Sequence, residues 1–99
     1  MAKYFLTKKA VEDLSKTWDY TYQAWLEKQA GSYYELLIKT CQAISKKPGV
    51  GKNYDEIAKD ILGFRVAKHI IFYRVTKPNE IAVVRILHER MDLRNRLAE

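Results

Sequence analysis

The spacing of the apolar residues changes once along this chain, and that change constrains the fold more than any other feature. From Val11 to Ile44, apolar side chains recur at steps of three or four residues, which is typical of an α-helix with one buried face. From Phe64 to Leu87 they fall instead in short runs rich in β-branched and aromatic residues, bounded by turn residues. Strands gathered after helices indicate an α+β domain.

Two helices are expected in the first half of the chain. A short strand, Lys3–Leu6, ends at Thr7, a good helix N-cap, and a helix follows from Lys8 with one apolar stripe: Val11, Leu14, Trp18, Tyr22 and Trp25. Gly31 suits the end of that helix, and Ser32 with Glu35 fits a capping box for the next. The second helix would run to Lys47, with its inner side formed by Tyr33, Leu37, Thr40, Cys41 and Ile44.

The second half of the chain predicts strands. After a loop at residues 48–60, the expected strands are Phe64–Ala67, His69–Val75 and Ile81–Leu87, and a turn at residues 77–80 makes a hairpin of the last two. Glu89–Glu99 is expected to be a short terminal helix or tail. The predicted order is therefore β-α-α-β-β-β plus a short C-terminal helix. A helical hairpin packs on a small, mainly antiparallel sheet, in a single domain of residues 1–99.

Positive charge is concentrated near the C-terminus. Residues 1–62 hold 10 basic and 8 acidic groups, for +2, whereas residues 63–99 hold 8 basic and 4 acidic groups, for +4. All six arginines lie in the second part, and arginine presents a planar fork of donors suited to carboxylates and phosphates. The partner is therefore expected to be acidic, but charge alone does not distinguish RNA, DNA and protein.

Several classes of site are disfavoured by the sequence. Cys41 is the single cysteine, so it predicts neither an internal disulfide nor a four-cysteine zinc site. His69 and His88 lack metal-ligand spacing, and Gly49–Lys52 lacks the spacing of a phosphate loop. No cofactor and no metal are expected. The N-terminus is too short and polar for a signal peptide and no segment is long enough to cross a membrane, so we expect a cytoplasmic protein.

Arg85 interrupts the otherwise apolar run Ile81–Leu87, so its guanidinium must be paired or must face solvent. One interpretation is a structural ion pair with Glu80, Glu89 or Asp92. The other is a sheet face on which Arg65, Arg74 and Arg85 present positive charge to a partner. The aromatic residues around the helical hairpin, including Trp18 and Trp25, are either core or part of a protein-binding face.

The last third of the chain resembles the closing motif of ParE toxins, in the RelE/ParE superfamily. The motif comprises Ile71–Arg74, then Val84–Leu93, then Arg96-Leu97, and its most specific part is the run His88-Glu89-Arg90-Met91-Asp92. The N-terminal pattern is similar too, in Ala10–Leu14, in Trp18–Thr21 and in Gln29-Ala30 before Tyr33. The resemblance covers nearly the whole chain and implies the same helical hairpin on an antiparallel sheet.

The resemblance also implies a function. ParE toxins of type II toxin-antitoxin systems, which serve plasmid or chromosome stability, poison DNA gyrase by binding it, without catalysis of their own. They are held inactive by a ParD-type ribbon-helix-helix antitoxin, whose C-terminal segment folds onto the toxin and can add a strand to its sheet. No sequence-specific nucleic-acid binding is expected of the toxin alone. The residues expected to bind partners are Arg65, Arg74, Arg85, His88, Glu89, Arg90, Met91, Asp92, Trp18 and Trp25.

A second hypothesis is a ribosome-dependent mRNA endonuclease of the RelE type. Arg65 and Arg85 would hold phosphate, while His88 and Glu89 would serve as acid and base. The stretch Met91-Asp92, and the lack of a tyrosine after Tyr73, depart from the nuclease pattern and favour the gyrase hypothesis. A third hypothesis is an inactive homologue that titrates antitoxin. The tail beyond Asp92 is expected to be needed for toxicity but not for folding.

Overall fold

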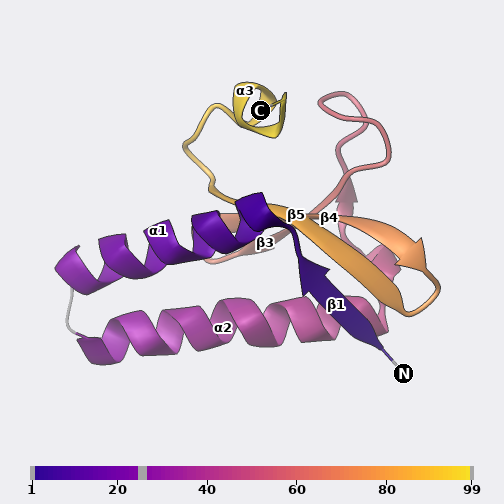
Figure 1. The fold of residues 1–99 in the computed structure, drawn as a ribbon. Coiled ribbons are helices and arrows are strands. Elements are labelled where there is room, and N and C mark those ends of the chain that lie inside the picture. The colour runs from indigo at the N-terminus through magenta and orange to yellow at the C-terminus, as the bar shows by residue number, and fades with distance from the viewer. Residues whose placement is uncertain (1, 25–26, 99) are drawn as a thin grey trace.

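A mixed five-stranded sheet forms the centre of the protein (Figure 1). The computed structural model describes residues 2–24 and 27–98, and its side-chain detail leaves out residues 18–30 and 98. The elements are β1 Lys3–Leu6, α1 Lys8–Ala24, α2 Glu27–Lys46, the 3-10 turn η1 Pro48–Val50, β2 Lys52–Asn53, β3 Leu62–Val66, β4 His69–Lys77, β5 Glu80–His88 and α3 Leu93–Ala98.

The strand order is β1-β5-β4-β3-β2, so the first and last strands of the chain are neighbours. β1 runs parallel to β5, with Tyr4 opposite Ile81, while the other pairings are antiparallel. The predicted α+β fold and the mainly antiparallel sheet are therefore confirmed. The two-residue strand β2 was missed, because it lies within the segment that we expected to be a loop.

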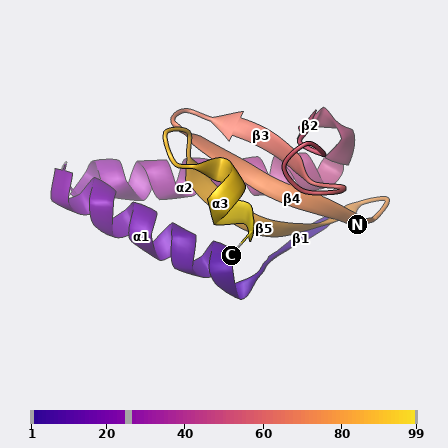
Figure 2. The ribbon, with the colours of Figure 1, turned by 90° about the horizontal axis from the view of Figure 1, so that it is seen from above.

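The two faces of the sheet are covered by different elements. The α1–α2 hairpin packs on one face, over a core cluster that includes Leu14, Leu37, Ile71 and Val83 (Figure 1). Seen from above, α3 crosses the other face (Figure 2). There the buried residues are fewer: Ile61, Ile70, Phe72 and Leu87. The sheet is thus an apolar layer between a large core and a small one.

Thr7 connects β1 to α1 and caps the helix as predicted. Its hydroxyl oxygen accepts a hydrogen bond from the backbone N–H of Ala10 at 3.2 Å and donates to the carbonyl of Val84 at 2.9 Å. The cap therefore satisfies a helix-end donor and also holds the start of α1 against β5.

The predicted boundary between the two helices is wrong. α1 ends at Ala24 and α2 already begins at Glu27, so Gly31 and Ser32 lie inside α2 and do not separate two helices. A glycine inside a helix costs only about 1 kcal/mol relative to alanine, which the packing of a 20-residue helix exceeds. The local capping signals at Gly31 and Ser32 therefore did not end a helix, because tertiary packing favours one continuous α2.

The predicted stripe of α1 is also wrong at Val11, which is 49% exposed, whereas Ala10 and Leu14 are buried. The buried face of α1 includes Asp13, a residue that a search for apolar periodicity passes over. Leu14 is buried as predicted, and the buried face takes in Asp13, which faces Arg85 as described below; the predicted stripe residue Tyr22 lies outside the described side chains. Trp18 lies in α1, but its side chain falls outside the described detail, and Trp25 falls outside the described residues.

The strands begin and end slightly differently from the prediction. β3 covers Leu62–Val66, and Ala67 and Lys68 form the two-residue turn to β4, with Ala67 at a φ of 53°. The turn η1, before β2, is fixed by Tyr73, whose hydroxyl donates to the Pro48 carbonyl at 2.6 Å and accepts from the Gly51 N–H at 2.9 Å. A Cβ on Gly51 would lie 2.3 Å from that hydroxyl oxygen, so the close approach requires glycine.

The C-terminal segment forms a helix that packs on the sheet. Leu93 and Leu97 of α3 contact the small core cluster, and the carbonyl of Arg96 accepts a hydrogen bond from the Arg85 guanidinium at 2.7 Å. Asp92 precedes α3 and accepts from the Asn95 N–H at 3.3 Å. The expectation that this tail is unimportant for folding therefore conflicts with its packing.

Candidate protein-binding surface

Arg85 is buried and paired. Its side chain is 10% exposed and donates to both carboxylate oxygens of Asp13, at 2.7 and 3.0 Å. Asp13 also accepts the backbone N–H of Ile86 at 3.0 Å, so the carboxylate is held by three donors. The structural ion pair that we considered for Arg85 is thus present, but its partner is Asp13 of α1 and not Glu80, Glu89 or Asp92. A guanidinium in this position does not project from the sheet to meet a partner.

Arg65 forms a second ion pair, on the surface, with Glu89. The guanidinium also donates to the Ala67 carbonyl at 3.2 Å, and the Glu89 N–H donates to the Lys68 carbonyl at 2.8 Å. These contacts attach the β3–β4 turn to the residues that follow β5. Arg65 and Glu89 therefore largely neutralise each other at one end of the sheet.

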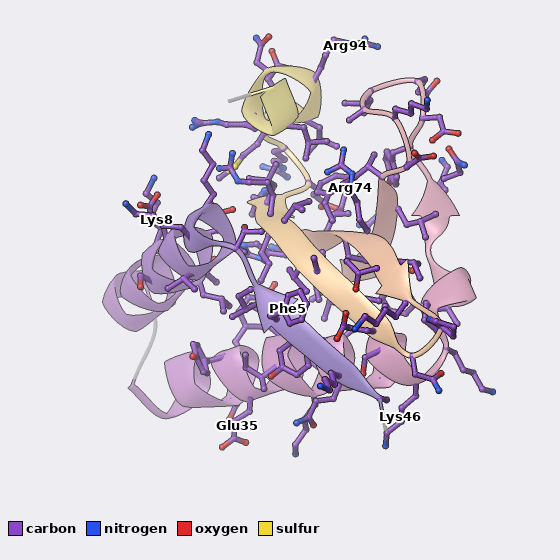
Figure 3. The ribbon with its side chains drawn as sticks, turned by 45° about the vertical axis from the view of Figure 1, so that its right-hand side comes forward. Phe5, Lys8, Glu35, Lys46, Arg74 and Arg94 are labelled. Carbon is purple, nitrogen blue, oxygen red and sulfur yellow. The ribbon has the colours of Figure 1, made fainter. Side chains whose placement is uncertain are left out.

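Arg74 lies elsewhere, on the exposed part of β4. Its guanidinium donates to the Lys59 carbonyl at 3.1 Å. Arg74 and Arg85 both line a hollow of about 330 Å³, together with Thr7, Lys8, Lys9, Ala58, Ile61, Val84 and Leu97. Figure 3 labels two of the residues that line the hollow, Lys8 and Arg74, and shows Phe5 on the near side of β1. The three strand arginines are therefore not a single patch.

His88 ends β5 beside a second histidine. Its Nδ1 accepts the backbone N–H of Arg90 at 3.1 Å, and its ring meets that of His69 edge-on, with the ring centroids 5.3 Å apart. His69 is buried, and its Nδ1 is hydrogen-bonded to the Tyr33 hydroxyl. Burial, and next the adjacent His88, lower the pKa of His69 to about 4, so His69 is neutral at pH 7.

Three of the predicted residues, His88, Arg90 and Met91, share one pocket of about 410 Å³ between α1 and the end of β5. The other lining residues are Asp13, Lys16, Thr17, His69 and Ile86. We refer to this space as the imidazole pocket. Asp92 does not line it, because its carboxylate accepts from the Asn95 side chain at 2.7 Å and N-terminally caps α3.

The sequence-based prediction missed Asp13, Lys16 and His69 as members of this region. One signal was available for Asp13. An acidic residue in the same helical stripe as Ala10 and Leu14 needs a buried cation, and Arg85 is the only charged residue in Ile81–Leu87. No comparable signal identifies Lys16, because its position beside β5 depends on how α1 packs.

The four groups suggested for RNA cleavage do not converge. Arg85 is bonded to Asp13, and Arg65 to Glu89, so neither guanidinium accompanies His88 in the imidazole pocket. Among the described residues, no three His, Cys, Asp or Glu side chains are arranged to hold a metal ion. Within the same part of the chain, no helix combines the length and apolarity needed to cross a membrane.

The comparisons with known proteins all give matches to ParE toxins. A family model described as the ParE toxin of type II toxin-antitoxin system, parDE, matches residues 4–93. The chain is 36% identical over 92 residues to Toxin ParE1 of Mycobacterium tuberculosis, covering 93% of this chain and 94% of that protein. It is 32% identical over 99 residues to Toxin ParE of Escherichia coli, covering 100% of this chain and 96% of that protein.

A solved structure supports the fold. The chain matches one described as the chromosomal ParDE TA system from P. aeruginosa with a TM-score of 0.75 and 18% sequence identity. The match covers 89% of this chain and 96% of that one. At this identity the likeness concerns architecture alone, and it agrees with the α+β arrangement of the helical hairpin and sheet.

Proposed function

The chain belongs to the ParE toxin family of type II toxin-antitoxin systems, and on that basis we propose that it inhibits DNA gyrase by binding, without catalysis of its own. The observation that carries the proposal is the family match over residues 4–93. The surface around the run His88–Asp92 supports it, because an exposed arginine and an exposed methionine lie beside a pocket there. Arginine and large apolar side chains are common at the centres of protein interfaces. A protein that meets gyrase must act in the cytoplasm.

The arrangement of charged residues supports binding over RNA cleavage. Cleavage requires an acid, a base and phosphate-binding cations around a single phosphate. In this chain Asp13 holds Arg85 and Glu89 holds Arg65, which leaves His88 without either guanidinium as a neighbour in its pocket. The nuclease hypothesis therefore loses the two arginines, Arg65 and Arg85, that it assigned to phosphate binding.

The proposal is tested by adding purified toxin to gyrase and relaxed plasmid DNA. We expect a dose-dependent loss of supercoiling, and linear DNA after detergent and protease treatment, because a trapped cleavage complex releases broken ends. An unchanged supercoiling rate at a large molar excess of toxin would contradict the proposal. In a parallel translation assay with purified ribosomes we expect no codon-specific mRNA cleavage. Cleavage that disappears in His88→Ala would establish the nuclease alternative.

We also propose that a ParD-type ribbon-helix-helix antitoxin neutralises this toxin. Among the described residues, β1 is an end strand of the sheet and its strand partner is β5, so its outer edge can accept a strand from the antitoxin. Phe5, which is 47% exposed, offers an apolar contact beside that edge, and Lys8 and Arg74 add positive charge nearby (Figure 3). An extended antitoxin segment with acidic and apolar side chains would suit this surface.

Phe5→Glu tests this contact. We expect at least about tenfold weaker binding of the antitoxin, since an apolar contact is replaced by a desolvated charge. Val11→Glu is the matched control, because Val11 is equally exposed but lies on α1. Isothermal titration with a purified ParD-type antitoxin that binds the wild-type toxin measures both variants. Equal affinity in the two would remove the β1 edge from the antitoxin interface.

A further inference from the structure

We propose that the imidazole pocket binds an acidic segment of the target protein, with a carboxylate at its cationic rim and an apolar side chain against its inner wall. The pocket lies between α1, which contributes Lys16 and Thr17, and the end of β5, which contributes His88. Its volume of about 410 Å³ is sufficient for two side chains of a docked peptide. Because His88, Arg90 and Met91 belong to the run that supports gyrase binding, this inference rests on the proposed function.

The charge of the pocket selects an anionic occupant. Among the residues whose side chains are described, Asp13, which lines the pocket, is engaged by Arg85, and Glu89, which follows His88, is engaged by Arg65. Lys16 and Arg90 line the pocket, are exposed, and form no salt bridge with any residue whose side chain is described. The neutralised pairs leave a net positive rim, which attracts a carboxylate and steers its approach.

The hydrogen bonds of the two histidines leave one donor for a ligand. His88 Nδ1 accepts from the Arg90 N–H, so the proton of the neutral ring is on Nε2. Both nitrogens of His69 are engaged, Nδ1 by Tyr33 and Nε2 by the Thr17 hydroxyl oxygen at 3.5 Å. The Thr17 hydroxyl itself donates to the Asp13 carbonyl at 3.0 Å. The His69 ring therefore packs against His88 without offering a free nitrogen, and His88 offers its Nε2–H to a ligand.

The apolar part of the pocket favours protein over nucleic acid. Ile86 is buried behind it, and Met91, which is 42% exposed, lies at its mouth. A nucleic acid backbone would present mainly charged phosphates to this pocket, whereas an acidic protein segment pairs a carboxylate with a neighbouring apolar side chain. Methionine adapts readily to the shape of such a partner.

The charged rim is tested with the double variant Lys16→Glu and Arg90→Glu. Biolayer interferometry measures binding of purified gyrase, without DNA, to the immobilised full-length toxin at low and physiological salt. We expect the dissociation constant to rise at least about tenfold, mainly through slower association, and the salt dependence to flatten. Lys39→Glu with Lys47→Glu is the control, because it changes the net charge equally at exposed positions outside the pocket.

The donor is tested separately with two amide variants of His88. Asn retains an acceptor where Nδ1 receives the Arg90 N–H but lacks the Nε2–H, whereas Gln places an N–H near the position of Nε2. We expect His88→Gln to bind gyrase more tightly than His88→Asn, by roughly threefold to tenfold. Equal melting temperatures of the two would confirm that the difference is not one of folding.

Three outcomes separate the two proposals. If the wild-type toxin does not bind gyrase, the proposed function fails and this inference fails with it. If the wild type binds and the rim variants bind equally well, the pocket is not the docking site and only the inference is overturned. If the rim variants lose binding to a DNA or RNA oligonucleotide while gyrase binding is unchanged, the pocket holds nucleic acid and the inference is also overturned.

Discussion

Arg85 and Arg65 both pair with a carboxylate, but their surroundings differ. The Arg85–Asp13 pair is buried where α1, β5 and α3 meet, and its hydrogen bonds reach Ile86 and Arg96 as well. The Arg65–Glu89 pair lies on the surface beside the β3–β4 turn, with the Arg65 side chain 67% exposed. The same arginine–carboxylate pairing therefore occurs once in the interior and once on the surface.

Burial decides whether such an ion pair stabilises the fold. In the interior, removing one partner leaves the other charge buried without its counter-charge, so the intact pair holds α1 against β5. On the surface, water replaces a lost partner, so the pair contributes little to stability. The surface pair instead neutralises Glu89, which leaves the rim of the imidazole pocket positive.

We expect the largest effect from removing the buried Arg85–Asp13 ion pair. Asp13→Ala should lower the free energy of unfolding by about 3–5 kcal/mol, because the Arg85 guanidinium remains buried without its counter-charge. Urea denaturation monitored by circular dichroism measures the change. Glu12→Ala, at the exposed neighbouring position, should stay within about 0.5 kcal/mol. A loss below about 1 kcal/mol for Asp13→Ala would show that the two pairs are energetically alike.

We expect the second largest effect from acid, which should lower the free energy of unfolding. The pKa of His69 is lowered by burial, and next by His88, to about 4, so the unfolded chain binds a proton at higher pH than the folded protein does. The neutral His69 contributes its full share of the unfolding free energy above pH 6.5. That share is lost as the pH falls towards 4, and the total loss is roughly 3 kcal/mol. Urea titrations across this range test the slope, which should flatten in His69→Gln. An identical slope in that variant would contradict the assignment.

Truncation after Asp92 should have an intermediate effect. It removes the packing of Leu93 and Leu97 on the small core and the hydrogen bond from Arg85 to the Arg96 carbonyl. We expect a loss of about 2 kcal/mol in unfolding free energy, since both leucines are half-buried. Leu97→Ala in the full chain should account for about half of that loss. An unchanged melting temperature would restore the sequence-based expectation of a tail unimportant for folding.

The smallest effect is expected at the surface pair. Arg65→Ala should reduce the unfolding free energy by less than about 1 kcal/mol, because the exposed charges are screened by water and salt. The same urea experiment, repeated at high salt, should bring the variant and the wild type closer together. A loss comparable with that of Asp13→Ala would mean that the β3–β4 turn depends on this pair.

The candidate site was predicted only in part. His88, Arg90 and Met91 share a pocket, and they were singled out because the run His88–Asp92 resembles the closing motif of ParE toxins; that they bind a partner stays a prediction. Arg85 was identified as an unusual residue in that run, but its partner was not found, because Asp13 is 72 positions away. The distance along the chain does not choose among 12 acidic residues, and the one signal for Asp13 is the helical stripe that it shares with Ala10 and Leu14.

The sequence by itself determined the order of the helices and strands, except the two-residue strand β2, and most of the core, because the spacing of apolar residues is a local property of each element. Tertiary structure decided the parallel pairing of β1 with β5, the continuation of α2 through Gly31 and the burial of Asp13. Each of these depends on contacts between segments far apart in the chain. Their free energy comes from packing, which overrides local preferences of about 1 kcal/mol.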